Sequence, residues 1–314
     1  MKKLVVVTIL FWCFHLSDGF AQCWERSYTP LQAKPDPNIP YSYQLSQISF
    51  IDDSIGWVAG IDYSPIINGQ DKVGICKTVD GGKTWKKQKV DKYSEDFEPM
   101  GLAFSGRDTG WLVGFSPNVL FSIDGGNTWD LMVDISKLWS GVSGGIANIF
   151  LQDGRTVWFF DRFSSEAVLF HTNNFGKTWD VKFSGIKGSS LYINSKGIGW
   201  ADNNIPVLDK ERLNKTTDNG ETFQQVLNLK GGTSKLSFHG DYGVVFNTIG
   251  TKILTTNDYG NNWDSIRLGP DSLILIKREK YYTGVDKIDS NEIIISGFNR
   301  YNLIDTIYIL NPLY

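Results

Sequence analysis

Cysteine and histidine are scarce in this sequence, whose 314 residues include 3 Cys and 3 His. Three cysteines are too few for a disulfide-rich scaffold, and isolated histidines do not indicate a metal site. Neither sign of charge dominates, since 31 Lys and Arg face 34 Asp and Glu, for a formal net charge of -3. The chain lacks the basic excess typical of nucleic-acid binders. We therefore expect no metal, no cofactor and no nucleic-acid partner.

Long hydrophobic runs are also missing. The longest, Leu4–Leu16, has about 13 mostly apolar residues, whereas a membrane-spanning helix needs about 20. It follows a short basic start and precedes the small residues Gly19 and Ala21, which is the order of a secretory signal peptide. The alternative is a buried apolar strand or helix. We expect residues 1–21 to be a signal peptide and 22–314 a single exported domain, periplasmic or extracellular in a bacterium, with no membrane span.

Cleavage after Ala21 leaves Cys23 and Cys76 in an oxidising compartment, where they are able to pair. The sequence does not determine whether their Cα atoms come within bonding distance, so a disulfide and two free thiols both remain open. Gln22 stands before Cys23, where a lipid-attachment site needs a small residue, and this favours a protein without a lipid anchor.

Glycine and aromatic residues are abundant, with 32 Gly, 11 Trp, 13 Tyr and 19 Phe, a composition that favours short strands and tight turns. Many of them lie in a segment that occurs five times, 40 to 50 residues apart. We call each copy a box. The shared positions are Asp80, Gly82, Thr84 and Trp85; Asp124, Gly126, Thr128 and Trp129; Asn174, Gly176, Thr178 and Trp179; Asp218, Gly220, Thr222 and Phe223; and Asp258, Gly260 and Trp263.

A second marker, a Gly-Trp pair, precedes the boxes, as at Gly56-Trp57 and Gly110-Trp111. Each unit thus consists of an apolar strand, a polar turn, a Gly-Trp strand, a variable loop, a third strand, a box and an outer strand. Four strands with this period are typical of a propeller blade.

Each shared residue type of the box has a structural role in a tight turn. An Asp or Asn side chain bonds backbone N–H groups across a tight turn, and Gly permits a positive φ. The aromatic residue supplies a large surface to bury between neighbouring blades. The boxes are therefore predicted to be structural, and no catalytic residue is predicted among them.

These segments resemble the Asp-box, or bacterial neuraminidase repeat. Together with the Gly-Trp-x-x-Gly element at residues 56–60, they are most similar to the photosystem II stability and assembly factor family of repeat proteins. The resemblance covers roughly residues 45 to 264. It implies a β-propeller scaffold that binds a partner protein and helps to assemble or stabilise a membrane or envelope complex.

The repeat length leaves six or seven blades open. Five units carry a box, and a sixth without one follows at residues 285–310 but has no outer strand. Near the start, Cys23–Tyr28 is similar to the segment after a box, with Trp24 in the aromatic position. We therefore predict an all-β, six-bladed β-propeller of four-stranded antiparallel blades, closed by an N-terminal strand, with seven blades as the alternative.

Recognition is expected on the rim away from the boxes, because loops there vary in length and composition. Arginine and aromatic residues are enriched at binding hot spots, and the candidates on this rim are Tyr63, Trp139, Arg162, Arg278, Tyr281 and Arg300. The alternative is that the charges are solvated and the aromatic rings fill gaps between blades. On the main hypothesis the partner is a protein.

The alternative function is a glycan-active enzyme or lectin, since the box is shared with sialidases. The chain has no Arg-Ile-Pro segment, which a sialidase carries near its first strand. Other glycosidases use two opposed carboxylates, for which Asp62, Asp71, Asp161 and Asp305 are candidates by residue type alone. The missing signatures favour a scaffold over an enzyme.

Overall fold

The computed structural model describes part of the chain. The described residues are 22–27, 45–62, 72–88, 97–142, 144–161, 168–183, 185–186, 188, 190–205, 210–230, 234–247, 252–267, 280–287, 293–299 and 305–312. The expected signal peptide, residues 1–21, lies outside them, so it stays a prediction.

Five sheets each take four consecutive strands, which pair antiparallel in chain order. Blade 1 contains β2 (Leu45–Phe50), β3 (Gly56–Asp62), β4 (Lys72–Thr78) and β5 (Lys86–Gln88). Blade 2 contains β6 (Pro99–Phe104), β7 (Gly110–Gly114), β8 (Ser116–Ser122) and β9 (Asp130–Asp134), followed by the 3-10 turn η1 (Ile135–Lys137). Blade 3 contains β10 (Ile146–Leu151), β11 (Val157–Asp161), β12 (Val168–Thr172) and β13 (Asp180–Phe183).

Blade 4 contains β14 (Leu191–Ile193), β15 (Gly199–Ile205), β16 (Lys210–Thr216) and β17 (Gln224–Lys230), and blade 5 contains β18 (Ser234–His239), β19 (Tyr242–Asn247), β20 (Lys252–Thr256) and β21 (Asp264–Arg267). A further four-stranded sheet, here the composite sheet, joins the two ends of the chain. Its strands are β22 (Lys280–Lys287), β23 (Ile293–Asn299), β24 (Asp305–Pro312) and β1 (Gln22–Ser27).

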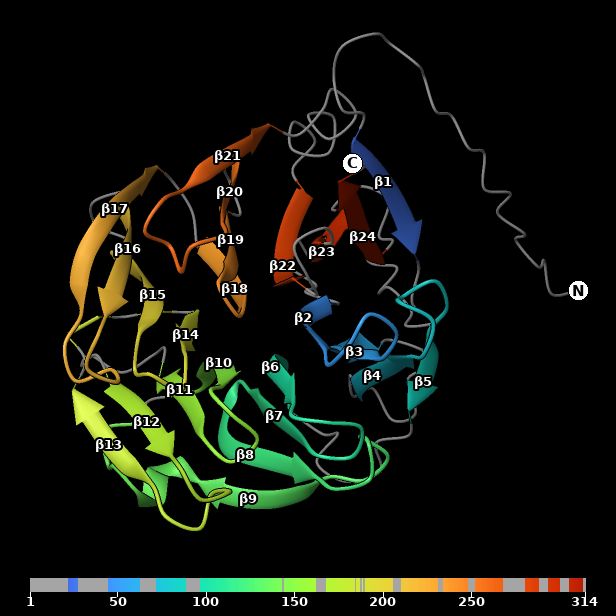
Figure 1. The fold of residues 1–314 in the computed structure, drawn as a ribbon. Coiled ribbons are helices and arrows are strands. Elements are labelled where there is room, and N and C mark those ends of the chain that lie inside the picture. The colour runs from blue at the N-terminus through green and yellow to red at the C-terminus, as the bar shows by residue number, and fades with distance from the viewer. Residues whose placement is uncertain are drawn as a thin grey trace, which may run out of the picture.

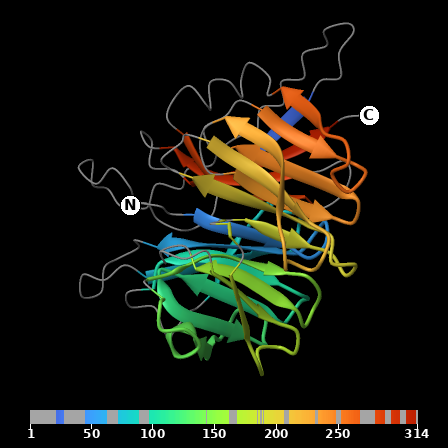
Figure 2. The ribbon, with the colours of Figure 1, turned by 90° about the vertical axis from the view of Figure 1, so that its left-hand side faces the viewer.

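The sheets follow one another around a central axis, with the first strand of each blade nearest the axis (Figure 1). In the view turned by 90°, they succeed one another from the green blades at the bottom to the orange blade at the top (Figure 2). The architecture is therefore an all-β propeller with four-stranded antiparallel blades.

Among the described strands, those far apart in sequence share a ladder in the composite sheet alone. Strand β1 runs antiparallel to β24, and Trp24 lies opposite Leu310. The sequence predicts this pairing from the similarity of Cys23–Tyr28 to the segment after a box.

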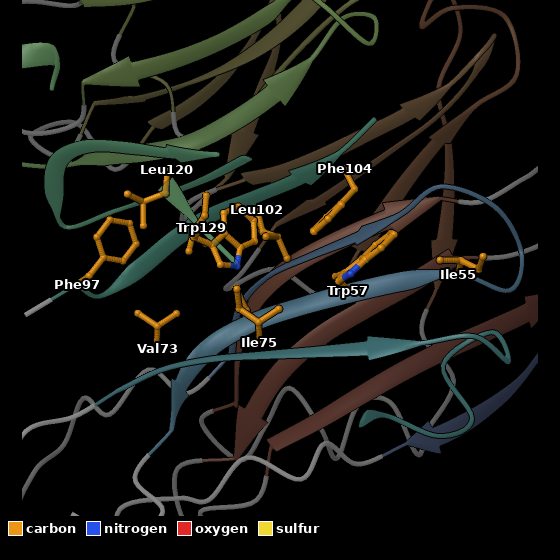
Figure 3. Packing of buried hydrophobic residues seen from close by; sticks show 11 residues of the cluster. Ile55, Trp57, Val73, Ile75, Phe97, Leu102, Phe104, Leu120 and Trp129 are labelled. Carbon is orange, nitrogen blue, oxygen red and sulfur yellow. The ribbon is translucent and has the colours of Figure 1, made fainter. Parts of the chain in front are cut away.

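The core lies between neighbouring blades, where the aromatic residue of each Gly-Trp strand is buried. Trp57 of β3 stacks on Phe104 of β6, with ring centroids 3.7 Å apart and planes 6° from parallel (Figure 3). Trp129 meets the same Phe104 ring edge-on at 6.0 Å. Burying a large apolar side chain stabilises a fold by roughly 1.5–3 kcal/mol, so this aromatic contact holds blades 1 and 2 together.

Within the described part of the chain, no helix is both long and apolar enough to cross a membrane.

Candidate functional site

Each box folds into the same hydrogen-bonded turn. In blade 2 the hydroxyl of Ser122 donates to Oδ1 of Asp124 (2.9 Å) and accepts from the N–H of Gly126 (2.9 Å). Oδ1 of Asp124 also accepts from the N–H of Thr128 (2.9 Å), and Oδ2 accepts from its hydroxyl (2.6 Å). One carboxylate thus holds both ends of the turn.

Two boxes keep this network with different residues. Asn174 replaces Asp in blade 3, where its Oδ1 accepts from the N–H of Thr178 (3.0 Å) and its Nδ2 donates to the Thr178 hydroxyl (2.8 Å). In blade 5, Asn262 replaces Thr and its Nδ2 donates to Oδ2 of Asp258 (2.7 Å). Donor and acceptor exchange places in blade 3, whereas in blade 5 the carboxylate remains the acceptor.

Two successive residues of every box lie in the left-handed region of backbone conformation. The second is always glycine, for example Gly82 at φ 83° and Gly126 at φ 89°. The first is Phe175, Asn219 or Tyr259 in blades 3, 4 and 5, with φ between 57° and 60°. A side chain in this conformation costs roughly 1–2 kcal/mol, which the bonds within the box offset.

Each box is also bonded to the turn between the first two strands of its own blade. The N–H of Gly81 donates to the backbone oxygen of Ser54 (2.9 Å), and that of Tyr259 donates to Asp241 (3.0 Å). The boxes and these turns therefore share one rim of the ring, the box rim. The loops between second and third strands, and those between blades, lie on the opposite rim, the loop rim.

The box carboxylates are poor proton acceptors. Hydrogen bonds from Thr222 hold the pKa of Asp218 at about 2, and those from Asn262 do the same for Asp258. For Asp80 and Asp124, partial burial raises the pKa, but bonds from the turn outweigh it and the net shift is downward. Such carboxylates stay ionised and hydrogen-bonded within their turns. They therefore lack the proton that a general acid must donate.

Of the six candidate binding residues, Trp139 is the one whose side chain the structure describes. Tyr63, Arg162, Arg278 and Arg300 lie outside the described residues, and Tyr281 lies in β22, where side chains are not described. Trp139 is described. It follows η1 between blades 2 and 3, is partly buried, and meets Phe183 edge-on with ring centroids 6.3 Å apart.

Phe183 and Phe115 were not singled out from the sequence. Phe183 ends β13 and is 62% exposed, while Phe115 lies between β7 and β8 and is 51% exposed. Since β9 and β13 both run away from their boxes, Trp139 and Phe183 lie on the loop rim, as does the β7–β8 connection. We call Phe115, Trp139 and Phe183 the loop-rim aromatics. Contiguous exposed apolar patches are typical of interaction sites, and the contact between Trp139 and Phe183 makes this pair the candidate for one.

A polar cluster crosses the boundary between blades 3 and 4. His171 is buried and stacks on Trp158 with ring centroids 3.8 Å apart. Its Nδ1 lies 3.3 Å from Oδ2 of Asp180, and Lys182 forms an ion pair with Glu221 of the next box. Burial lowers the pKa of His171, outweighing the opposite effect of Asp180.

The carboxylates considered for glycosidase chemistry are spread over separate sheets. Asp62 ends β3, Asp161 ends β11 and Asp305 begins β24, while Asp71 lies outside the described residues. Across the described segments, no group of three or more His, Cys, Asp or Glu side chains is placed to hold a metal ion. Cys76 is buried in β4, and because the side chain of Cys23 is not described, the pairing of these two cysteines stays untested.

The centre of the ring contains a cavity of about 150 Å³. It is lined by residues of the innermost strands β2, β6, β10, β14 and β18. Apolar residues of these strands, such as Ile48 and Leu102, are buried in the core. The polar side chains of Gln47, Ser49 and Ser237 also belong to the cavity lining.

Comparison with known proteins gives a consistent picture. A family model for the photosynthesis system II assembly factor YCF48 matches residues 32–199. The photosystem II stability/assembly factor HCF136, chloroplastic, of Arabidopsis thaliana is 24% identical over 187 residues, which cover 54% of this chain and 40% of the relative. The chain thus matches less than half of that relative's length.

Solved structures share the fold at low identity. A structure of YCF48 bound to D1 peptide is 16% identical, with a TM-score of 0.54, covering 95% of this chain and 99% of that one. An α-L-arabinanase of Penicillium chrysogenum complexed with arabinobiose is 13% identical, with a TM-score of 0.61, covering 92% and 98% of the two chains. Likeness at these identities shows the fold alone, because one fold hosts many functions.

Proposed function

Because the chain belongs to the photosynthesis system II assembly factor YCF48 family, we propose that it is an exported, non-catalytic scaffold that binds a partner protein. The partner is a subunit of an envelope complex whose assembly or stability depends on the scaffold. YCF48 itself has been solved with a peptide bound, which supports a protein ligand for this chain. The periplasmic or extracellular location rests on the expected signal peptide.

The observation that carries the binding surface is the contact between exposed Phe183 and partly buried Trp139 on the loop rim. Aromatic side chains supply much of the energy of protein interfaces, and a partner that covers Phe183 removes a large apolar surface from water. The predicted loop-rim residues Tyr63, Arg162, Arg278, Tyr281 and Arg300 extend this surface. Arginine there provides a charged contact for partner carboxylates.

The boxes are proposed to be structural, since their polar groups bond to one another and to the adjacent turn. The composite sheet is proposed to close a ring of six blades, which makes residues 22–314 one domain. The β1–β24 ladder supports this closure, because it pairs the two chain ends and removes sheet edges that would otherwise be exposed.

The test is affinity purification from the native organism with the wild-type protein, with the double variant Trp139→Ala/Phe183→Ala, and with Arg162, Arg278 and Arg300 changed together to Ala. Val226→Ala is the control, because Val226 is an exposed apolar residue on the outer strand β17 of blade 4. We expect the same partner with wild type and control, and its loss with the two loop-rim variants. Undiminished recovery with both would refute the surface, and wild-type protein that captures no partner would refute the function.

A further inference from the structure

The central cavity has a polar wall with an unusual feature. Consecutive residues of the innermost strands line the cavity, among them the buried apolar residues Ile48, Leu102 and Leu236 and the polar residues Gln47 and Ser237. Within the described chain, the side-chain oxygen Oε1 of Gln47 is buried and has no hydrogen-bond partner. Buried acceptors are normally satisfied by protein or by a bound molecule, so this oxygen marks a place for a donor.

Other polar side chains on or beside the inner strands already accept hydrogen bonds from backbone N–H groups. The Ser49 hydroxyl accepts from the N–H of Phe104 (3.1 Å) and links β2 to β6. Oδ1 of Asn148 accepts from the N–H of Ile149 (2.8 Å). The hydroxyl of Ser190, the residue before β14, accepts from the N–H of Leu236 on β18 (3.1 Å). These bonds tie the wall together, and they set the unpartnered oxygen of Gln47 apart from its neighbours.

The cavity also has an aromatic side. Tyr192 of β14 meets Phe150 of β10 with ring centroids 5.2 Å apart and stacks on Phe238 of β18 at 4.7 Å. All three residues line the cavity, and the described lining includes no Asp, Glu, Lys, Arg or His. Aromatic walls with a few well-placed polar groups are typical of small-molecule sites, and an uncharged lining disfavours an ionised ligand, whose charge would lose its hydration without gaining a partner.

We propose that the central cavity binds a single small, neutral polyhydroxylated molecule, of the size of a monosaccharide or cyclic polyol, through a hydroxyl that donates to Oε1 of Gln47. The C–H faces of such a molecule pack against the rings of Phe150, Tyr192 and Phe238. The described lining contains no carboxylate, whereas a glycosidase needs two opposed ones, so the proposal is one of binding. This site is separate from the loop rim and does not depend on the proposed partner protein.

The test is titration calorimetry of the full mature protein with L-arabinose, D-glucose and myo-inositol as neutral probes, and with D-glucuronate as the charged match to glucose. Gln47→Met removes the acceptor while keeping an unbranched side chain, and Gln47→Leu is the second variant. Gln225→Met is the control, because Gln225 is exposed on the outer strand β17. Thermal unfolding verifies that each variant is folded.

We expect saturable millimolar binding of at least one neutral probe to wild type and to Gln225→Met, at least about tenfold weaker binding to the Gln47 variants, and no binding of glucuronate. The proposal is overturned if no neutral probe binds the wild type. It is equally overturned if folded Gln47 variants bind as well as wild type, or if glucuronate binds as tightly as glucose.

Discussion

The indole Nε1 of Trp57 donates a hydrogen bond to the backbone oxygen of Gly125, 2.9 Å away and 68 residues later in the chain. Trp57 belongs to the Gly-Trp strand of blade 1, and Gly125 to the box of blade 2. Trp200 of blade 4 makes the corresponding bond to Tyr259 in the box of blade 5 (3.2 Å). The two sequence markers therefore meet across these two blade boundaries, and the boxes of blades 2 and 5 are held by the blade before them as well as by their own.

The first prediction compares two buried tryptophans. Nε1 of Trp111 is buried without a hydrogen-bond partner among the described residues, so Trp111→Phe is a matched control for Trp57→Phe. Both variants lose apolar contact, but only Trp57→Phe also loses a hydrogen bond between blades. We expect Trp57→Phe to lower the free energy of unfolding by about 1 kcal/mol more than Trp111→Phe, as measured by urea denaturation. Equal losses would show that the bond contributes nothing.

The second prediction concerns the chemistry of the box. Asp124→Ala removes the acceptors for Ser122 and for the backbone and hydroxyl of Thr128, and we expect it to destabilise the fold by about 2 kcal/mol. Asp124→Asn should cost less than half as much, since Asn174 makes the equivalent bonds in blade 3. Chemical denaturation of both variants measures the difference. If Asn is as harmful as Ala, the charge matters more than the bonding pattern.

The third prediction is an acid transition. The pKa of Asp218 and that of Asp258 are about 2 in the folded chain, against about 3.9 in an unfolded one. A lowered carboxyl pKa contributes stability that is fully present above about pH 4 and is lost as the pH falls through about 2. Over this pH range, the midpoint temperature of thermal unfolding should depend less steeply on pH for Asp218→Asn than for wild type. Parallel curves would contradict the assignment.

The fourth prediction concerns His171, which faces Asp180, Lys182 and Glu221. Burial lowers its pKa, so below about pH 6.5 the unfolded chain binds a proton more readily than the folded chain does. Its contribution to stability is therefore fully present above about pH 6.5 and falls as the pH drops below that value. His171→Phe keeps a ring against Trp158 and should flatten the dependence between about pH 5 and 7. Free energies of unfolding measured at about pH 5 and about pH 7 test this prediction. If the variant has the same pH dependence as wild type, His171 is not the cause of that dependence.

Much of the fold follows from the sequence, because the informative residues have narrow physical roles. A Gly at positive φ beside an Asp that bonds its own turn leaves little choice of conformation, so Asp80-Gly-Gly82 and its copies identify the box turns. Trp24, which occupies the aromatic position of a segment that follows a box, predicts the pairing of β1 with β24. The sequence predicts local structure best at positions where only one conformation or packing role suits the residue type.

The candidate site was harder to predict. Phe183 is an aromatic strand residue like the buried Phe170 of β12, and it is exposed because β13 is the outer strand of its blade. The unpartnered oxygen of Gln47 depends on what the four other innermost strands of the cavity lining bring to the axis. The sequence pattern does not predict the missing bond of Trp111 either, since Trp57 belongs to the same kind of Gly-Trp pair and makes the bond.

The ladder between β1 and β24 sets the order in which the molecule becomes complete. A chain that emerges with its N-terminal end first presents β1 long before residues 305–312 are available to pair with it. Until then, β1 and the edge of β23 that later receives β24 have unsatisfied backbone groups, which are a template for wrong pairing with other chains. During biogenesis a chaperone that shields extended segments would therefore be needed most near the two ends of the polypeptide, while the five sequential blades assemble from local contacts.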